Sequence, residues 1–278
     1  MVGTAAMYDK ADRLYVLRSI LAPISSLRWR WFIRGFHRKI GAPPPPARIL
    51  AKPVRAYVHK QFWPRHRVAL LLEHFHWSRT LFTSDFLKRI CANQPIELVV
   101  LQGRRDKYLI FISGSLAVIS QREGEISIYL AKTLASPRLA RISFLFCKVS
   151  GRLSLVIGGI QGPPAANKHA VIDATRDLHG LRPKDAIFLA VRMFAQQFLI
   201  ENVYAIGDAN HVLQRLQNSA KFSSYDAYWR DRGGISEPVY GFRFEPLSQE
   251  CKIKNKRNEM KEAISTSISV FTNSIRIR

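Results

Sequence analysis

Polar side chains that could transfer protons or hold an anion gather in the second half of the sequence. His179, His211 and Asp226 are the candidate catalytic residues, because a histidine near a carboxylate can act as base or acid at neutral pH. The candidate substrate-binding residues are Arg176, Arg182, Lys184, Gln161, Tyr225 and Trp229. A purely structural network that orients loops would use the same residue types, so the sequence leaves both interpretations open.

The segment TRDLHGLRPKDAI, residues 175–187, indicates how some of these side chains are positioned. Gly180 can end one helix in a left-handed conformation, and Pro183 suits the first turn of the next helix. The following stretch, AIFLAVRMFAQQFLI, is too apolar to lie in a DNA groove and is expected to be buried. We therefore predict that His179 and Arg182 lie at the mouth of a pocket shared with His211 and Asp226. Arg182 would bind an anion through two parallel hydrogen bonds.

The elements that must hold these residues predict an α+β fold. Five β-rich runs predict an antiparallel meander, at residues 96–102, 107–113, 125–131, 141–149 and 152–160, with Ser150–Gly151 as a hairpin turn. Helices are expected at 66–90, 167–178, 183–199 and 209–217, and returning strands at 202–208 and 239–247. If the strand at 202–208 lies beside the strand at 152–160, His211 emerges at the same end of the sheet as Gln161.

Positive charge is the strongest signal in the composition. The 278 residues carry a formal net charge of +23. Residues 1–90 hold 17 Lys and Arg against 4 Asp and Glu, residues 91–250 hold 19 against 14, and residues 251–278 hold 7 against 2. Such an excess predicts a salt-sensitive contact with a polyanion, either nucleic acid or an anionic membrane surface.

The N-terminal region combines this charge with aromatic side chains in LRWRWFIRGFHRKI, residues 27–40. Its candidate contacts with a membrane or another polyanion are Arg28, Trp29, Arg30, Trp31 and Arg34. On a helix the aromatic residues share one face, which could equally pack on the main domain. Four consecutive prolines follow and predict an extended linker. We predict an arm at 1–40, a linker at 41–49, a domain at 50–250 and a basic tail at 251–278.

Localisation and metal content are inferred from further patterns. No apolar run is long enough to span a bilayer, and charged residues interrupt the place of a secretion signal. The three cysteines have neither zinc nor dithiol spacing, and His74 and His76 stand two positions apart on a predicted helix, where they do not face each other. We expect a cytoplasmic protein without a metal, which the basic ends could attach peripherally to an anionic membrane surface.

The order of the elements is similar to that of acetyl-CoA-dependent N-acyltransferases. In that fold, backbone amides after the fourth strand bind a pyrophosphate at a helix N-terminus. The stretch IGGIQGPP offers glycines at this place, but Pro163 and Pro164 lack the N–H groups that such a contact uses. The resemblance implies acyl-CoA or another acyl donor as cofactor without deciding between them.

Several motifs together resemble the VirK/YbjX-type family of Gram-negative bacterial proteins. They are VALLLEHFHW, LVIGGIQGP, DATRDLHGLRPKD, NVYAIGDANH, YDAYWRDRGG and YGFRFEPL, within residues 50–247. The resemblance implies a virulence role in the envelope, through production of surface virulence proteins and resistance to antimicrobial peptides, but no particular reaction. An acyltransferase-like pocket at the inner membrane surface would fit this role. The alternative is an RNA-binding factor that acts after transcription on a surface virulence protein.

Overall fold

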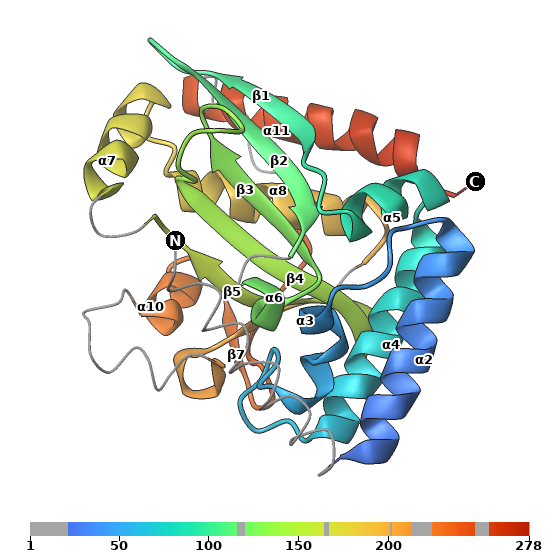
Figure 1. Ribbon diagram of the computed structural model, residues 1–278. Helices are drawn as coiled ribbons and strands as arrows, with labels where there is room; N and C mark the ends of the chain where they lie inside the picture. The colour runs from blue at the N-terminus through green and yellow to red at the C-terminus, as the bar shows by residue number, and fades with distance from the viewer. Residues whose placement is uncertain are drawn as a thin grey trace, which may run out of the picture.

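A single mixed sheet forms the centre of the protein (Figure 1). The computed structural model describes residues 22–115, 120–163, 167–200, 202–212, 224–247 and 256–277. The sheet has eight strands in the order β1-β2-β3-β4-β5-β6-β8-β7. Their bounds are β1 Ile96–Gln102, β2 Lys107–Gly114, β3 Ile126–Ala131, β4 Ala140–Val149, β5 Arg152–Gln161, β6 Asn202–Ile206, β7 Ile235–Glu237 and β8 Gly241–Phe244. The predicted α+β class is confirmed.

The first five strands form the predicted antiparallel meander, each paired with its neighbour in sequence. Ser150 and Gly151 join β4 to β5 with φ angles of 50° and 81°. Two successive positive φ values give a turn whose twist matches that of the strands, which explains the tight hairpin. The β-branched and aromatic residues of these runs therefore paired as their local pattern predicts.

β5 and β6 form the parallel pair of this sheet, and they diverge. Their register runs from Ser154 opposite Asn202 to Ile157 opposite Ala205. Beyond that point β5 continues through Gly158–Gln161, paired only with β4. β6 ends at Ile206 and pairs on its other edge with β8. The edge of β5 that faces β6 therefore has no paired strand over Gly158–Gln161. Other segments of the chain lie at this opening.

Two long helices pack together behind the sheet in Figure 1, α8 (Pro183–Gln197) and α11 (Lys256–Ile275). α11 buries Met260, Ile264, Ile268 and Thr272, which recur at four-residue steps on one face. The N–H of Thr83 donates to the carbonyl of Ile275, so the end of α11 is fastened to the body. The prediction of a C-terminal tail is wrong for residues 256–275, which form this helix. A few apolar residues at four-residue spacing are enough to bury one of its faces.

The predicted helix at 66–90 is two helices, α4 (Pro64–Leu81) and α5 (Ser84–Cys91). Phe82 interrupts them in an extended conformation, and Thr83 is the N-cap residue of α5. The Phe82 ring lies 5.7 Å from that of Phe146 and 5.9 Å from that of Phe194. Burial of this ring between α4, β4 and α8 overrides the continuous helical pattern.

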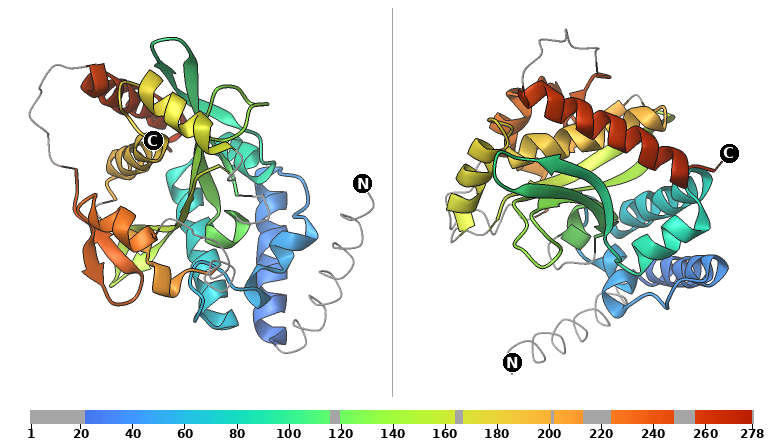
Figure 2. Two further views of the ribbon diagram at one scale, coloured as in Figure 1. Left: turned by 90° about the vertical axis from the view of Figure 1, so that its left-hand side faces the viewer. Right: turned by 90° about the horizontal axis from the view of Figure 1, so that it is seen from above.

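α2 (Pro23–Ile40) lies on the outside of α4 in both views of Figure 2. Its Trp29 is fully buried, and the indole N–H donates to the carbonyl of Ile49 at 2.8 Å. Ile49 belongs to α3 (Ala47–Leu50), which follows the proline segment and precedes the short helix η1 (Lys52–Val54). The described part of the predicted arm therefore shares the core of the rest of the chain, and residues 1–21 lie outside the described residues.

The helix junction at Gly180 is as predicted. α7 (Lys168–Asp177) ends before His179 and Gly180, whose φ angles are 52° and 84°, and Pro183 begins α8. The carboxylate of Asp177 accepts hydrogen bonds from the backbone N–H groups of Arg105 and Asp106, at 2.8 and 3.1 Å. The end of α7 thereby holds the turn between β1 and β2.

Three short elements stand near the opening between β5 and β6: α6 (Ser120–Glu123), η3 (Asp208–Asn210) and α10 (Tyr225–Arg230). The helix predicted at 209–217 is represented only by η3, and its positions from 213 onward lie outside the described residues. These elements carry the polar side chains described next.

Candidate functional site

A fully buried carboxylate, that of Glu123, stands against the Gly158–Gly159 stretch of β5. A Cβ atom at position 159 would lie 2.5 Å from the carboxylate, and one at position 158 would overlap the main-chain carbonyl of Glu123. Only glycine at these two positions leaves room for the α6 backbone and its terminal side chain. The Gly158–Gly159 pair of the GGIQG motif thus creates the space for Glu123.

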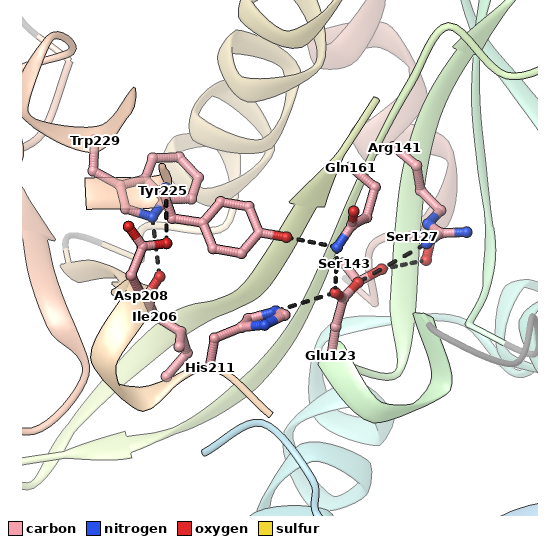
Figure 3. Close-up of polar contacts among 10 residues, drawn as sticks. All are labelled: Glu123, Ser127, Arg141, Ser143, Gln161, Ile206, Asp208, His211, Tyr225 and Trp229. Carbon is pink, nitrogen blue, oxygen red and sulfur yellow. Dashed lines mark hydrogen bonds and ion pairs between the residues drawn. The ribbon is translucent and has the colours of Figure 1, made fainter. Parts of the chain in front are cut away.

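The Glu123 carboxylate uses its two oxygens unequally (Figure 3). Oε1 accepts a hydrogen bond from Gln161 Nε2 at 2.8 Å and lies 3.2 Å from His211 Nε2. Oε2 accepts no hydrogen bond from any described residue, and the guanidinium of Arg141 stands 4.0 Å from it. A buried carboxylate oxygen without a donor is unusual because desolvation costs free energy that hydrogen bonds normally offset.

Tyr225 completes the polar cluster from the side of α10. Its hydroxyl oxygen accepts the second hydrogen bond of Gln161 Nε2, at 2.5 Å, and its ring lies 4.8 Å from that of His211. Gln161 therefore bridges the phenol and the carboxylate. We call Glu123, Arg141, Gln161, His211 and Tyr225 the Glu123 cluster.

α10 is held in place by two interlocked aspartates. Asp208 accepts hydrogen bonds from Ser224 Oγ and from the backbone N–H of Tyr225, at 2.6 and 2.9 Å. Asp226 in turn accepts from the backbone N–H of Asp208 at 2.7 Å. The predicted catalytic residue Asp226 thus fastens the segment that follows β6 to α10, which positions His211 and Tyr225.

Burial shifts the pKa values of two members of the cluster, Tyr225 and Arg141. Burial, and after it the negative charge of Glu123, raises the pKa of Tyr225 well above its ordinary value, so the phenol stays protonated at neutral pH. Burial also lowers the pKa of Arg141, while the nearby Glu123 acts in the opposite direction. The cluster thus holds a phenol, which can donate a proton, and the Glu123 carboxyl group, which can accept one, on either side of Gln161.

The structure brings some of the predicted site residues together and separates others. Gln161, His211 and Tyr225 belong to the Glu123 cluster, with Asp226 next to it. Trp229 is fully buried and its indole N–H donates to the carbonyl of Ile206, so it supports β6 from inside the core rather than facing a substrate. The ammonium group of Lys184 stands 5.6 Å from the centre of the Tyr228 ring, close to α10.

The other predicted residues lie elsewhere. His179 accepts a hydrogen bond from Arg104 of the β1–β2 turn, at 3.3 Å. Arg176 is exposed on α7, and Arg182 is exposed at the N-cap position of α8. The prediction that His179 and Arg182 share a pocket mouth with His211 remains a prediction.

The predicted membrane contacts also divide. Trp31 is 82% exposed and Arg28 and Arg34 are exposed, while Arg30 is half-buried. Trp29, in contrast, cannot touch a membrane or a nucleic acid in this fold because its side chain is fully inside the core. This is a correction to the sequence analysis.

Sequence reasoning missed Glu123 and Arg141. Glu123 stands in the charged stretch QREGE, which reads as an exposed turn between two strands. The available signal was the glycine pair at 158 and 159, because glycines within a strand indicate close approach of another backbone. By their resemblance to the N-acyltransferase loop, the same glycines had instead suggested a phosphate-binding segment.

Among the described residues, no three His, Cys, Asp or Glu side chains gather as a metal ion requires. His74 instead accepts a hydrogen bond from the backbone N–H of Phe146 at 3.1 Å. No helix in the described part of the chain has both the length and the apolarity to cross a bilayer.

These observations define an α+β protein with a buried acid–base cluster where two parallel strands diverge. Comparison with known sequences places it further: residues 7–261 match the family described as "Protein of unknown function (DUF535)", and the chain belongs to that family. It is similar to "Uncharacterized protein YbjX" of Escherichia coli (strain K12), at 23% identity over 272 residues, which cover 92% of this chain and 82% of that protein. The predicted resemblance to the VirK/YbjX-type family is thereby confirmed.

A second relative is an "Uncharacterized protein" of Haemophilus influenzae, 25% identical over 179 residues, or 64% of this chain and 58% of the relative. No solved structure matches the chain. The names of these relatives state no activity, so function has to be argued from the site.

Proposed function

We propose that the Glu123 cluster catalyses acyl transfer to a component of the bacterial envelope, at the inner surface of the membrane. The observation that carries this proposal is the pairing of a donor-free carboxylate oxygen with a protonated phenol in the opening between β5 and β6. An antiparallel meander that leads into one diverging parallel pair also agrees with the resemblance to N-acyltransferases. The resemblance to the VirK/YbjX-type family supplies the envelope and virulence context.

The proposed step uses Glu123 as base and Tyr225 as acid. An amine or hydroxyl of the acceptor attacks the acyl carbonyl carbon of the donor, and its proton passes to Oε2 of Glu123. The bond between the acyl carbon and the leaving group breaks, and the leaving group takes the phenolic proton of Tyr225. Water then removes the proton from Glu123 and returns one to Tyr225, so the protein is unchanged and the acceptor is acylated.

The donor is proposed only as an activated acyl group. Pro163 stands two positions after the end of β5 and has no N–H, so it cannot donate a backbone hydrogen bond to a pyrophosphate. The segment 164–166, where further contacts would be expected, lies outside the described residues. For this reason the test below includes donors with and without a pyrophosphate.

The test supplies the purified full chain with membrane extract and a deuterium-labelled donor, either acetyl-coenzyme A, palmitoyl-coenzyme A or an acyl phospholipid. Mass spectrometry of the extract then measures label transfer. We expect Glu123→Gln to lower transfer by at least about 100-fold and Tyr225→Phe by about 10-fold to 100-fold, the usual range for general acid–base groups. Glu97→Gln, which changes an exposed glutamate on β1, is the control and should leave transfer unchanged.

Absence of label transfer from every donor would refute acyl transfer. Full transfer by Glu123→Gln would instead show that the reaction takes place elsewhere on the molecule. The Glu123→Gln variant can also be tested in a deletion strain with an envelope phenotype. If it restores the phenotype as well as the parent chain does, the biological role does not depend on the Glu123 cluster.

A further inference from the structure

The outer face of α2 carries an apolar stripe that the protein core does not use. Ile24, Leu27 and Trp31 are 81%, 65% and 82% exposed. Steps of three and four residues place these side chains in one row along the helix. The opposite face of the same helix is buried and includes Trp29 and Ile33. α2 is therefore apolar on two faces, of which the described part of the chain covers only one.

Basic residues border the exposed stripe on both sides. With about 100° of rotation per residue, Arg30 and Arg34 fall on one flank of Leu27 and Trp31, and Arg28 and Lys39 fall on the other. Arg28, Arg34, Arg38 and Lys39 are exposed. Arg79 of α4 lines the same hollow as Arg30 and Trp31, so the positive charge extends from α2 onto its neighbour.

Negative charge is missing from this part of the chain. No Asp or Glu occurs between residues 13 and 72, a stretch that includes the whole of α2. We infer that the outer face of α2, formed by Ile24, Leu27 and Trp31 with their basic flanks, is a docking surface for an anionic lipid bilayer. This inference rests on the proposed function for its choice of a membrane-bound acceptor, and it names the face of the protein that meets the membrane.

The aliphatic side chains decide between lipid and nucleic acid. Arginine and tryptophan serve both partners, through phosphate contacts and through stacking on bases or insertion among headgroups. Ile24 and Leu27 have no ring to stack on a base, and they gain from burial only in an apolar medium such as the acyl boundary of a bilayer. Their exposure beside Trp31 is thus explained by a membrane and left unexplained by RNA.

The rigid attachment of α2 makes the face ready to bind. The Trp29 indole is bonded to Ile49, and the Trp29 ring lies 5.7 Å from the Phe75 ring of α4. A free amphipathic peptide has to fold when it reaches the membrane, whereas α2 is already helical and oriented by the core. The ordering cost of docking is correspondingly small.

The test measures binding of the full chain to vesicles by sedimentation, with phosphatidylglycerol and phosphatidylethanolamine in equal parts, and with phosphatidylcholine alone. We expect binding to the anionic vesicles only, weakened by salt. Leu27→Ser combined with Trp31→Ser, and separately Arg28→Glu combined with Arg34→Glu, should each weaken binding by at least about tenfold. The blue shift of tryptophan emission on vesicle addition should disappear in Trp31→Phe.

Matched controls stand elsewhere on the surface. Arg104→Glu combined with Arg105→Glu makes the same charge change on the exposed β1–β2 turn, and Val270→Ser removes a 68%-exposed apolar side chain of α11. Both should bind vesicles like the parent chain. Equal binding to neutral vesicles, or loss of binding in the controls to the same extent, would overturn the inference.

A polyuridine oligonucleotide provides the competing outcome. Binding of this RNA that depends on Arg28 and Arg34 but is indifferent to Leu27→Ser, together with no vesicle binding, would assign the face to nucleic acid instead. Failure here is distinct from failure of the proposed reaction. The α2 variants should keep turnover of a water-soluble acyl donor, and Glu123→Gln should keep vesicle binding.

Discussion

Two buried glutamates, Glu123 and Glu125, flank Gly124 and differ in how completely their carboxylates are paired. Glu125 forms an ion pair with Lys52 and accepts a hydrogen bond from the hydroxyl of Tyr57 at 2.7 Å. Both members of that ion pair are more than nine-tenths buried. Glu123 has polar neighbours too, but its Oε2 has no donor among the described residues, and the guanidinium of Arg141 stands 4.0 Å from this oxygen.

The difference separates a structural charge from a candidate catalytic one. At Glu125 the protein provides a cation and a hydroxyl, and so joins η1 to β3. At Glu123 the carboxylate is fully buried, and among the described residues only its Oε1 has hydrogen-bonding partners. Natural proteins tolerate such an incomplete arrangement mainly where a substrate or water supplies the missing contact.

The largest expected effect concerns the Glu125 ion pair. Lys52→Met leaves a buried carboxylate without its cation and should lower the free energy of unfolding by about 3–5 kcal/mol, measured by urea denaturation. Adding Glu125→Gln to Lys52→Met should recover much of this loss, because the amide can still accept from Tyr57. Lys60→Met, at an exposed lysine, is the control. An unchanged urea midpoint for Lys52→Met would show that the pair is not structural.

A smaller loss is expected at the glycines that make room for Glu123. Gly159→Ala places a methyl group 2.5 Å from the carboxylate, so the side chain or the strand must shift. We expect about 1–3 kcal/mol of destabilisation, as for overpacked cores, together with loss of acyl transfer. Gly35→Ala in α2 has nothing within 4 Å of the added methyl and should stabilise the protein slightly. A neutral Gly159→Ala variant would mean that Glu123 is not confined there.

Acid is expected to lower the free energy of unfolding through His74, a buried histidine whose pKa is lowered in the folded protein. Burial, and after it the charge of Lys52, lowers the pKa of His74 to about 3. In the unfolded chain the His74 imidazole binds a proton near pH 6.5, whereas in the folded protein it stays neutral until the pH approaches 3. The contribution of neutral His74 to the free energy of unfolding is therefore fully present above pH 6.5 and is lost as the pH falls toward 3. The slope is at most about 1.4 kcal/mol per pH unit.

His74→Asn keeps an acceptor for the N–H of Phe146 and should flatten this acid slope between pH 6.5 and 4. His37 and His59 also have pKa values lowered by burial and contribute with the same sign, so some slope should remain. His76→Asn, an exposed histidine of the same helix, should leave the slope unchanged. Urea denaturation at several pH values provides the measurement, and identical slopes for both variants would contradict the assignment to His74.

The smallest effect on stability is expected at Glu123 itself. In Glu123→Gln the amide oxygen can keep the contacts of Oε1, while the amide nitrogen takes the place of Oε2, which accepts no hydrogen bond from the described residues. We expect a loss of about 1 kcal/mol, because the nearest Arg141 nitrogen stands 4.0 Å from Oε2, a long distance for an ion pair. Glu125→Gln, the matched substitution two residues away, should cost clearly more. Equal losses would end the distinction between the two glutamates.

Much of the fold could be predicted from local patterns. The five strands of the meander, the Ser150–Gly151 turn and the Gly180–Pro183 junction all follow from side-chain alternation and turn chemistry that neighbouring residues carry. The helix break at Phe82 and the docking of α11 did not follow. Both depend on burial against residues far away in the chain, Phe146 and Phe194 in one case and α8 with β1 in the other.

The candidate site was predictable only in part, and for the same reason. The sequence by itself determined that Gln161 and His211 each follow a strand, and the parallel pairing of β5 with β6 in the tertiary structure brings them to one end of the sheet. Only the tertiary structure decided that Glu123 is buried, that Trp29 faces the core and that Trp31 does not. A charged turn and an amphipathic helix have the same local sequence whether or not a distant surface covers them, so burial is a property of the packed chain.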